Sequence, residues 1–553
     1  MRPIERRIGL LFAGFLVLLL FAAGRAVWFG TLGSARLERA ALTQQVSELP
    51  VPAQRGTIRD RHGIELAVSE PALAVAANPF LIGDPVRLAD RLAGPLRTDA
   101  RVLLRKLADR DAGFVYLARG VPAARVEPLR RLKLTGIELL PETRRVYPRG
   151  WLAAQLLGTV GTDNVGRAGL EYAQQRVLRG HDGTRRLVKD ALGEPISLRD
   201  LSVARPGSDV TLTIDARIQD RVEAVLGEVG RVWRPKGATA IALDPRSGEV
   251  LALANWPRVD PATFGSAPEY ARQNRAVGAV YEPGSTFKAI TMAGALEEQV
   301  TRPQTTFDLA PQIEVADRTI KEAHERGWVR LSAAEILAQS SNVGAITIAT
   351  RMGEQRFATW VERFGFGHST GSGIPGEERG IVPSVDRYSG ASIGNLPIGQ
   401  GLSVTPMQMA VAYAAIANGG ILRAPRLLRA VGERRRAPPR GRRVVSAATA
   451  SDLRLMLEGV TGPGGTAPEA AIEGYALAGK TGTAQKPDPL YGGYSKTRYV
   501  ASFVGFAPVR APRLLVAVMV DEPQGAITGG QVAAPAFQRI MSFALPYLQV
   551  APD

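Results

Sequence analysis

Ser285 and Lys288 stand three residues apart in the segment YEPGSTFKAITMAGALEE. Pro283-Gly284 predicts a turn and residues 285–298 predict a helix, so both side chains should project from one face of its first turn. A serine hydroxyl is a weak nucleophile at neutral pH unless a base takes its proton. Lysine can be that base when burial and neighbouring cations lower its pKa, whereas arginine stays protonated. The alternative is a helix-capping serine followed by a solvated lysine.

A second polar group, Ser340-Ser341-Asn342, interrupts the apolar stretch AEILAQSSNVGAITIA. Three consecutive polar residues need hydrogen-bond partners if they are buried. As a helix cap or a turn they would be unremarkable. As part of a reactive site, Ser340 can relay a proton and Asn342 can hold both Lys288 and an amide of a substrate.

A third group, Lys480-Thr481-Gly482-Thr483, lies in the strand-like run YALAGKTGTAQ. Glycine in a strand lets a ligand approach the backbone closely. Two threonine hydroxyls and a lysine charge suit a carboxylate. The chance expectation for the pattern K-T-G in a chain of this composition is on the order of 0.05. Only nine of the 69 basic residues are lysines, so lysine at both 288 and 480 points to a requirement that arginine would not meet.

One further serine motif, Gly367-His368-Ser369-Thr370-Gly371, matches the G-x-S-x-G pattern of a nucleophile elbow. That motif needs a helix after the serine and a catalytic histidine later in the chain. The next residues, SGIPGEERG, are rich in glycine and contain a proline, and no histidine follows Ser369. We expect a glycine-rich loop here.

The helices and strands expected around these three groups indicate an α+β domain over residues 208–550. Two hairpins, at 238–254 and at 498–523, frame helical stretches such as 406–420. Before residue 208, short strand-like pieces follow Pro50, a helical stretch runs through 88–131, and turns are expected at 141–150 and 166–180. Residues 205–207 (Arg-Pro-Gly) read as a linker.

The N-terminus carries an uncharged run of 17 residues, Ile8 to Gly24, which extends through Arg25 to Gly30. About 17–25 residues cross a bilayer, and the arginines before the run should stay in the cytoplasm. We expect a cytoplasmic tip at 1–7, a transmembrane signal anchor at 8–30, and a stalk and pedestal at 31–205 that begins with a helix over 32–49. A cleaved signal peptide and a buried core helix are the alternatives.

The order S-x-x-K, S-x-N, K-T-G resembles that of the penicillin-recognising serine acyl-transferases. The segment RGTIRDRHGIELAVS at 55–69 is similar to a box of the class B penicillin-binding proteins, and 144–150, 158–161 and 169–171 fit the rest of their pedestal. Residues 394–410 and 529–537 resemble division-type septal transpeptidases, particularly actinobacterial ones. We expect no glycosyltransferase module, which favours this monofunctional class over the bifunctional class A.

The resemblance implies a penicillin-binding, β-lactamase-like transpeptidase fold, with an antiparallel sheet flanked by helices. It implies that Ser285 attacks the peptide bond between two D-alanines of a peptidoglycan stem while Lys288 takes its proton. The oxyanion hole would come from the backbone N–H groups of Ser285 and Thr483. The remaining roles are proton transfer to the leaving D-alanine by Ser340, orientation of Lys288 and the stem peptide by Asn342, and binding of the terminal carboxylate by Lys480, Thr481 and Thr483 around Gly482. No metal or other cofactor is expected.

The implied partners are stem peptides on a lipid-linked precursor, β-lactams, a polytopic septal glycosyltransferase and other divisome membrane proteins. Three other functions remain open: an elongation-type transpeptidase, a membrane-anchored D,D-carboxypeptidase or β-lactamase that uses water, and a non-enzymatic divisome scaffold or penicillin sensor.

The composition of the chain excludes several classes of protein and of site. With 45% hydrophobic and 22% charged residues the chain is not disordered, and without cysteine it has no disulfide, thiol catalysis or cysteine metal site. A net charge of +17 ordinarily suggests nucleic acid as a partner, but a domain exported across the membrane does not encounter nucleic acid. The arginine-rich tract at 423–443 is a solvated loop or a contact for anionic lipid or wall polymer.

Overall fold

The computed structural model describes residues 3–30, 46–189, 195–488 and 492–553. The chain divides into two compact units. The first comprises Met1–Gln54, Ala72–Thr143 and Gly180–Gly207, and the second comprises Arg55–Pro71, Arg144–Arg179 and Ser208–Asp553. Two segments that precede the linker in sequence therefore pack with the C-terminal unit.

The N-terminal helix α1 (Pro3–Gly30) contains one stretch, Arg7–Trp28, that is long and apolar enough to cross a membrane. Its described side chains are exposed, so this apolar surface is free to contact lipid. The helix predicted over 32–49 falls largely outside the described residues. Its last four residues lie instead in strand β1 (Val46–Val51), so the prediction is wrong there, because β1 pairs with a strand more than 130 residues later in the chain.

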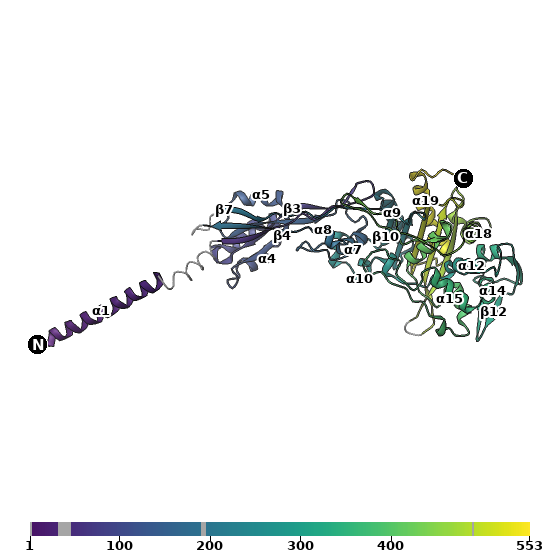
Figure 1. Cartoon of the computed structure of the whole chain (residues 1–553), viewed down its shortest axis with the longest axis horizontal. Coiled ribbons are helices and arrows are strands. Elements are labelled where there is room, and N and C mark those ends of the chain that lie inside the picture. Colours follow the sequence, from purple (N-terminus) through teal and green to yellow (C-terminus); the bar gives the residue numbers. More distant parts are fainter. Residues whose placement is uncertain (1–2, 31–45, 190–194, 489–491) are drawn as a thin grey trace. The chain divides into compact units, whose positions relative to one another are not determined.

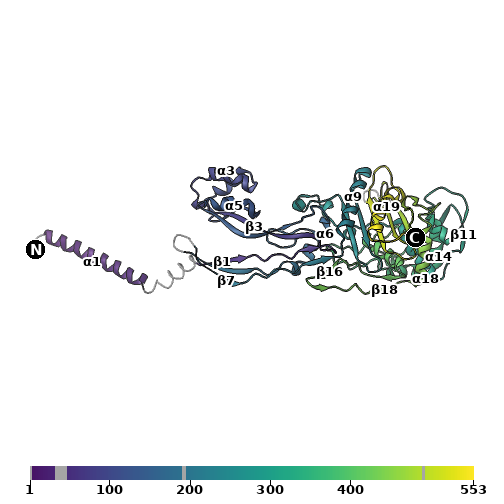
Figure 2. The same cartoon turned by 90° about the horizontal axis from the view of Figure 1, so that it is seen from above.

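In the first unit, β1 forms a three-stranded sheet with β6 (Gly183–Lys189) and β7 (Pro195–Ser202). A separate apolar core gathers α3 (Pro85–Leu96), α4 (Ala100–Leu107) and α5 (Ala123–Arg131) around strand β4 (Val115–Pro122). Figure 2 shows α3 and α5 close together in this part of the chain. The helical prediction for 88–131 is therefore wrong at β4, which is held by antiparallel pairing with β3 (Glu65–Ala77). The turns predicted at 141–150 are likewise replaced in part by strand β5 (Ile137–Val146).

The second unit is built on a five-stranded antiparallel sheet in the order β10-β9-β21-β20-β19. These strands are Val250–Trp256, Gly237–Leu243, Leu514–Asp521, Tyr494–Ala507 and Ala478–Pro487. Every residue of β21 is buried, because helices cover both faces of the sheet. Both predicted hairpins are confirmed.

One face of this sheet packs on α9 (Ala216–Trp233) and the C-terminal helix α19 (Gly529–Tyr547), which Figure 1 shows in yellow beside the strands. The other face contributes to a larger core with α12 (Lys288–Glu297), α15 (Glu354–Arg363), α17 (Pro406–Ala417) and α18 (Ala447–Glu458). All twelve residues of α17 are buried, which explains its apolar character on every side. The α+β architecture expected from the sequence is confirmed.

The arginine-rich tract at 423–443 is not only a loop. It contains the short strands β16 (Leu428–Val431), β17 (Arg434–Arg435) and β18 (Arg442–Arg443). Strand β16 pairs with β8 (Val210–Leu212), and the β17 and β18 arginines are exposed.

Candidate active site

Ser285 lies on a single 3-10 turn, η3 (Gly284–Phe287), and Lys288 is the first residue of helix α12. The helix predicted over 285–298 is therefore confirmed, with a tighter first turn. Gly284 has a φ of +54°, and a Cβ added there would lie 3.3 Å from both Ala484 Cβ and the Thr483 carbonyl oxygen. Glycine thus lets this turn lie directly against strand β19. Ser285 is half-buried at the surface of the turn.

Lys288 is only 2% exposed, and its ammonium group meets the second polar group of the sequence. Its Nζ donates to the Ser340 carbonyl oxygen and to Asn342 Oδ1, both at 2.6 Å, and lies 3.3 Å from Ser340 Oγ. Burial lowers the pKa of Lys288 to about 7, against a smaller opposing effect of the Glu322 carboxylate. Within the described chain, no hydrogen bond joins Ser285 Oγ to Lys288 Nζ. Such bonds often tighten only when substrate is bound.

The Ser340-Ser341-Asn342 segment is both a helix cap and a lysine-binding site. Ser341 caps helix α14 (Asn342–Met352) by accepting a hydrogen bond from Gly344 N at 2.9 Å. Ser340 precedes it in the left-handed region, with φ +61°. This turn aims the flanking oxygens of Ser340 and Asn342 at Lys288, so the segment caps a helix and also binds the buried lysine.

Glu322 is a residue that the sequence analysis missed. It follows strand β13 (Arg318–Lys321), and its side chain is 6% exposed. Its carboxylate accepts from Ser341 Oγ at 2.5 Å and from Asn342 N at 2.7 Å, and it pairs with Arg326. The backbone oxygen of Lys321 also accepts from Asn342 Nδ2 at 3.0 Å. The residues at the end of β13 therefore fix Asn342, which holds Lys288.

The third polar group lies on β19, the edge strand of the sheet. Lys480 is fully buried, and the only hydrogen bonds of its Nζ among the described residues are long ones, at 3.3 Å, to Thr481 O and Oγ1. Burial and then the nearby charge of Lys288 lower the pKa of Lys480 well below its usual range. A Cβ on Gly482 would come within 2.4 Å of Ser502 Oγ and 2.9 Å of the Pro283 carbonyl oxygen, so no larger residue fits.

Two residues support this strand from the side. Thr466 Oγ1 lies 2.7 Å from Thr481 Oγ1, and Gly529 N donates to Thr483 Oγ1 at 3.1 Å. Thr466 was also missed by the sequence analysis, because it belongs to no recognisable motif. The structure thus brings all three polar groups together around one turn of the chain.

The G-x-S-x-G match at 367–371 lies in a loop, as predicted. Ser369 donates to Glu377 Oε2 at 2.7 Å, and the side chain of Ser372 bonds to the same oxygen at 3.0 Å. These contacts make the segment a carboxylate-centred loop rather than a nucleophile elbow.

Comparison with known proteins points to the same family as the three motifs, along the whole chain. Residues 238–542 match the penicillin binding protein transpeptidase domain, and residues 50–212 match the penicillin-binding protein dimerisation domain. The chain is 35% identical over 577 residues to penicillin-binding protein PbpB of Mycolicibacterium smegmatis, covering 96% of this chain and 88% of that one. It is 33% identical over 557 residues to peptidoglycan D,D-transpeptidase FtsI of Escherichia coli K12, covering 100% and 93%.

Among solved structures, penicillin-binding protein 3 of Mycobacterium tuberculosis complexed with aztreonam matches with a TM-score of 0.72 and 30% identity. That match covers 91% of this chain and 98% of the other. The resemblance inferred from the motifs is confirmed. The chain belongs to the penicillin-binding proteins and, within them, to the septal class B proteins.

Proposed function

We propose that Ser285 is the nucleophile and Lys288 the base with which this chain cross-links peptidoglycan. The chain is a serine-type D-Ala-D-Ala transpeptidase of septal wall synthesis and a penicillin target. The observation that carries the residue assignment is the setting of Lys288. It is buried, has its pKa lowered to about 7, and is held by Ser340 and Asn342 three residues after the serine.

In the first half-reaction, neutral Lys288 accepts the proton of Ser285 while Oγ bonds to the carbonyl carbon of the penultimate D-alanine. The C–N bond to the terminal D-alanine then breaks, and the proton passes from Lys288 through Ser340 Oγ to the departing amine. The 3.3 Å separation of Lys288 Nζ from Ser340 Oγ supports this route. Asn342 keeps Lys288 in place and presents its amide to the stem peptide.

The substrate carboxylate binds at the start of β19. Lys480 supplies the charge, and the hydroxyls of Thr481 and Thr483 supply hydrogen bonds. Gly482 lets the strand pack closely against Ser502 and the Pro283 carbonyl group, next to the Ser285 turn. The backbone N–H groups of Ser285 and Thr483 hold the oxyanion.

In the second half-reaction, the amine of a neighbouring stem attacks the acyl-enzyme carbonyl. The amine loses a proton to Lys288, the C–O bond to Ser285 breaks, and the serine recovers its proton. The product is a 4→3 cross-link, because the acyl group is held through the carbonyl of the fourth residue of the donor stem. A penicillin acylates Ser285 in the same way, because it presents a carboxylate and a strained amide.

The apolar N-terminal helix supports the placement in the cell that we propose. Residues 1–7 stay in the cytoplasm, 8–30 span the membrane, and the pedestal (31–205) and transpeptidase domain (208–550) lie outside, where the lipid-linked precursor is found. Its partners there are a polytopic septal glycosyltransferase and other divisome membrane proteins.

Labelling with a fluorescent penicillin tests the nucleophile: we expect wild type to be labelled and Ser285→Ala to be blank. A thioester analogue of D-Ala-D-Ala, incubated with a D-amino acid, tests the reaction. We expect an aminolysis product, and hydrolysis alone would identify a carboxypeptidase.

A further inference from the structure

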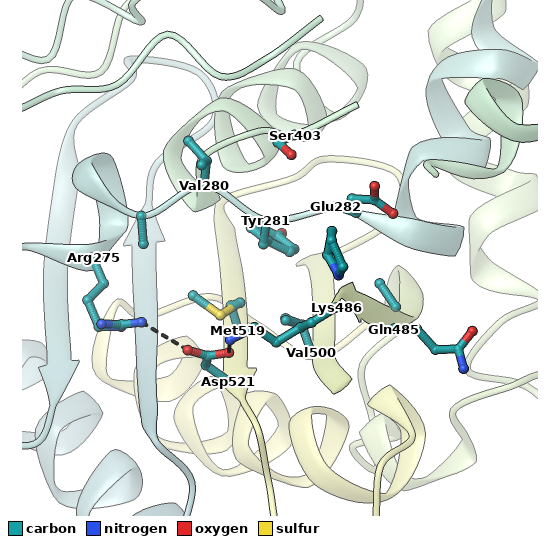
Figure 3. A pocket seen from close by; sticks show the side chains of 13 residues that line it. Arg275, Val280, Tyr281, Glu282, Ser403, Gln485, Lys486, Val500, Met519 and Asp521 are labelled. Atoms are coloured by element: carbon teal, nitrogen blue, oxygen red, sulfur yellow. Dashed lines mark hydrogen bonds and ion pairs between the residues drawn. The ribbon is translucent and has the colours of Figure 1, made fainter. Parts of the chain in front are cut away.

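A pocket of about 170 Å³ lies beyond the Lys480–Thr483 segment, between the sheet and the chain just before Ser285. Val500 and Met519 line it from the sheet, and Val280 and Tyr281 line it from the opposite segment. Figure 3 shows these apolar side chains between two charged groups, with Arg275 at one side and Glu282 at the other. The pocket therefore has room for an aliphatic side chain with a polar end.

The charges on the Arg275 side neutralise one another. Lys486 Nζ bonds to Asp521 Oδ1 at 2.8 Å and to Glu522 Oε1 at 2.6 Å. Arg275 Nη2 bonds to Asp521 Oδ2 at 3.1 Å, and Tyr270 donates to the same oxygen at 3.0 Å. Two cations thus meet two carboxylates, and Lys236 Nζ lies 3.9 Å from Glu522 Oε1. Arg275 Nε and Nη1 are buried and have no hydrogen-bond partner among the described residues.

Glu282, on the other side, has no cationic partner in the described part of the chain. Its Oε1 accepts from Tyr494 Oη at 3.2 Å and from Gly401 N at 3.1 Å. Its Oε2 is buried and has no hydrogen bond within residues 3–30, 46–189, 195–488 and 492–553. Burial raises the pKa of this carboxyl. A buried carboxylate with a free oxygen is costly unless a donor reaches it.

The direction of the substrate leads to this pocket, on the premise that the proposed function is correct. The terminal carboxylate then lies at Lys480, and the reacting carbonyl lies where the Ser285 turn meets Gly482 and Ala484. The preceding residues must continue along the free edge of β19 toward Lys486, at about 3.3 Å per residue in an extended chain. The residue before the two D-alanines therefore arrives at the pocket.

We propose that this pocket binds the side chain of the residue that precedes the two D-alanines, and that Glu282 receives an ammonium group at its end. A stem that serves as acceptor in a 4→3 cross-link carries its amine on that same residue. The apolar walls accommodate the methylene groups, and the ammonium pairs with the carboxylate of Glu282, which lines the pocket. Glu282 is thus a specificity residue for the donor stem.

A matched pair of donors tests the proposal: N-acetyl-L-lysyl-D-alanyl-D-thiolactate and its norleucyl analogue, which lacks the amine. The full-length protein in detergent micelles is assayed for thioester cleavage. We expect wild-type kcat/KM to be about tenfold higher for the lysyl donor, equivalent to one buried charge-assisted hydrogen bond. Acetylating the lysyl amine should remove this preference. In Glu282→Gln the ratio should fall to about one, while Glu325→Gln, an exposed carboxylate, should retain the wild-type ratio.

A wild-type ratio of one, or a tenfold ratio that survives in Glu282→Gln, would overturn the proposal. Labelling by fluorescent penicillin shows whether Glu282→Gln is folded. If that variant is not labelled, the wild-type comparison of free and acetylated amines decides alone. Failure of the proposed function would look different, because wild type would then cleave neither donor and Ser285 would not be labelled.

Discussion

Two buried lysines in the candidate site have opposite surroundings. Lys288 donates two hydrogen bonds of 2.6 Å to oxygens of Ser340 and Asn342, and the carboxylate of Glu322 acts on its charge. Lys480 is fully buried with contacts of only 3.3 Å, both to its neighbour Thr481. The pKa of each is lowered mainly by burial, and the nearby charge of Lys288 also lowers that of Lys480.

The difference separates a base from a binding site. Lys288 has fixed acceptors, so it can lose and regain a proton without moving. Lys480 lacks such acceptors in the described chain, and an ionised substrate carboxylate would supply what its ammonium group needs. Substrate binding would then raise the pKa of Lys480 and keep it charged.

Replacing each lysine by arginine should give the largest contrast. Arginine keeps the charge but cannot act as a base, so Lys288→Arg should slow acylation by benzylpenicillin about 1,000-fold. Lys480→Arg still binds a carboxylate and should lose only about tenfold, for the strain of a larger buried group. Stopped-flow acylation rates measure both, with thermal unfolding as the check on folding. Equal losses would mean that the two lysines share one role.

The pH dependence of acylation should report Lys288. Its pKa is lowered to about 7, so the neutral base predominates above that pH and is lost below it. The second-order rate should therefore fall about 30-fold between pH 8 and pH 5.5, close to tenfold per unit at the acid end. Benzylpenicillin stays ionised throughout this range. A flat profile would exclude Lys288 as the base.

Glu322→Gln should shift the pH profile of acylation to lower pH and should reduce its plateau. The groups that face Lys288 are Glu322 and Lys480, and Arg326 faces Glu322. Without the carboxylate the pKa of Lys288 falls further, so the acid limb should shift to lower pH. The plateau should drop about tenfold, because the turn that holds Asn342 loses a charge-assisted hydrogen bond.

Glu325→Gln provides the matched control, since this carboxylate is exposed three residues away. It should leave both the limb and the plateau where they are in wild type. A Glu322→Gln plateau that falls with an unmoved limb would show that Glu322 supports only the shape of the turn. Rescue of the limb by Glu322→Asp would support the electrostatic role.

Much of this site could be predicted from local sequence. The three polar groups and both hairpins depend on residue spacing and turn residues, which the chain displays within a few positions. The helix after Ser285 and the strand that carries Lys480 were therefore predictable. The 3-10 turn at Gly284 was not, because it depends on close packing against β19.

The misses have a common physical cause. Strands β1 and β4 pair with strands distant in sequence. The local spacing of apolar residues therefore favoured a helix in segments whose structure depends on strand pairing. Glu322 belongs to no motif, and it acts across about 20 residues on the N-terminus of helix α14. Thr466 likewise reaches Thr481 only after the chain has folded.

Thr466→Val should give the smallest effect on acylation. It should also separate the role of Lys480 from that of Lys288 most clearly. The change removes the hydroxyl partner of Thr481 Oγ1 and leaves the side-chain volume nearly unchanged. Thr481 is the only residue that Lys480 contacts by hydrogen bonding within the described chain, so carboxylate binding should weaken about threefold, less than a full neutral hydrogen bond. Because nothing near Lys288 changes, the acid limb of the pH profile should stay fixed while the plateau falls. A moved limb would mean that the two lysines respond as one coupled pair, and the division between base and carboxylate site would have to be abandoned.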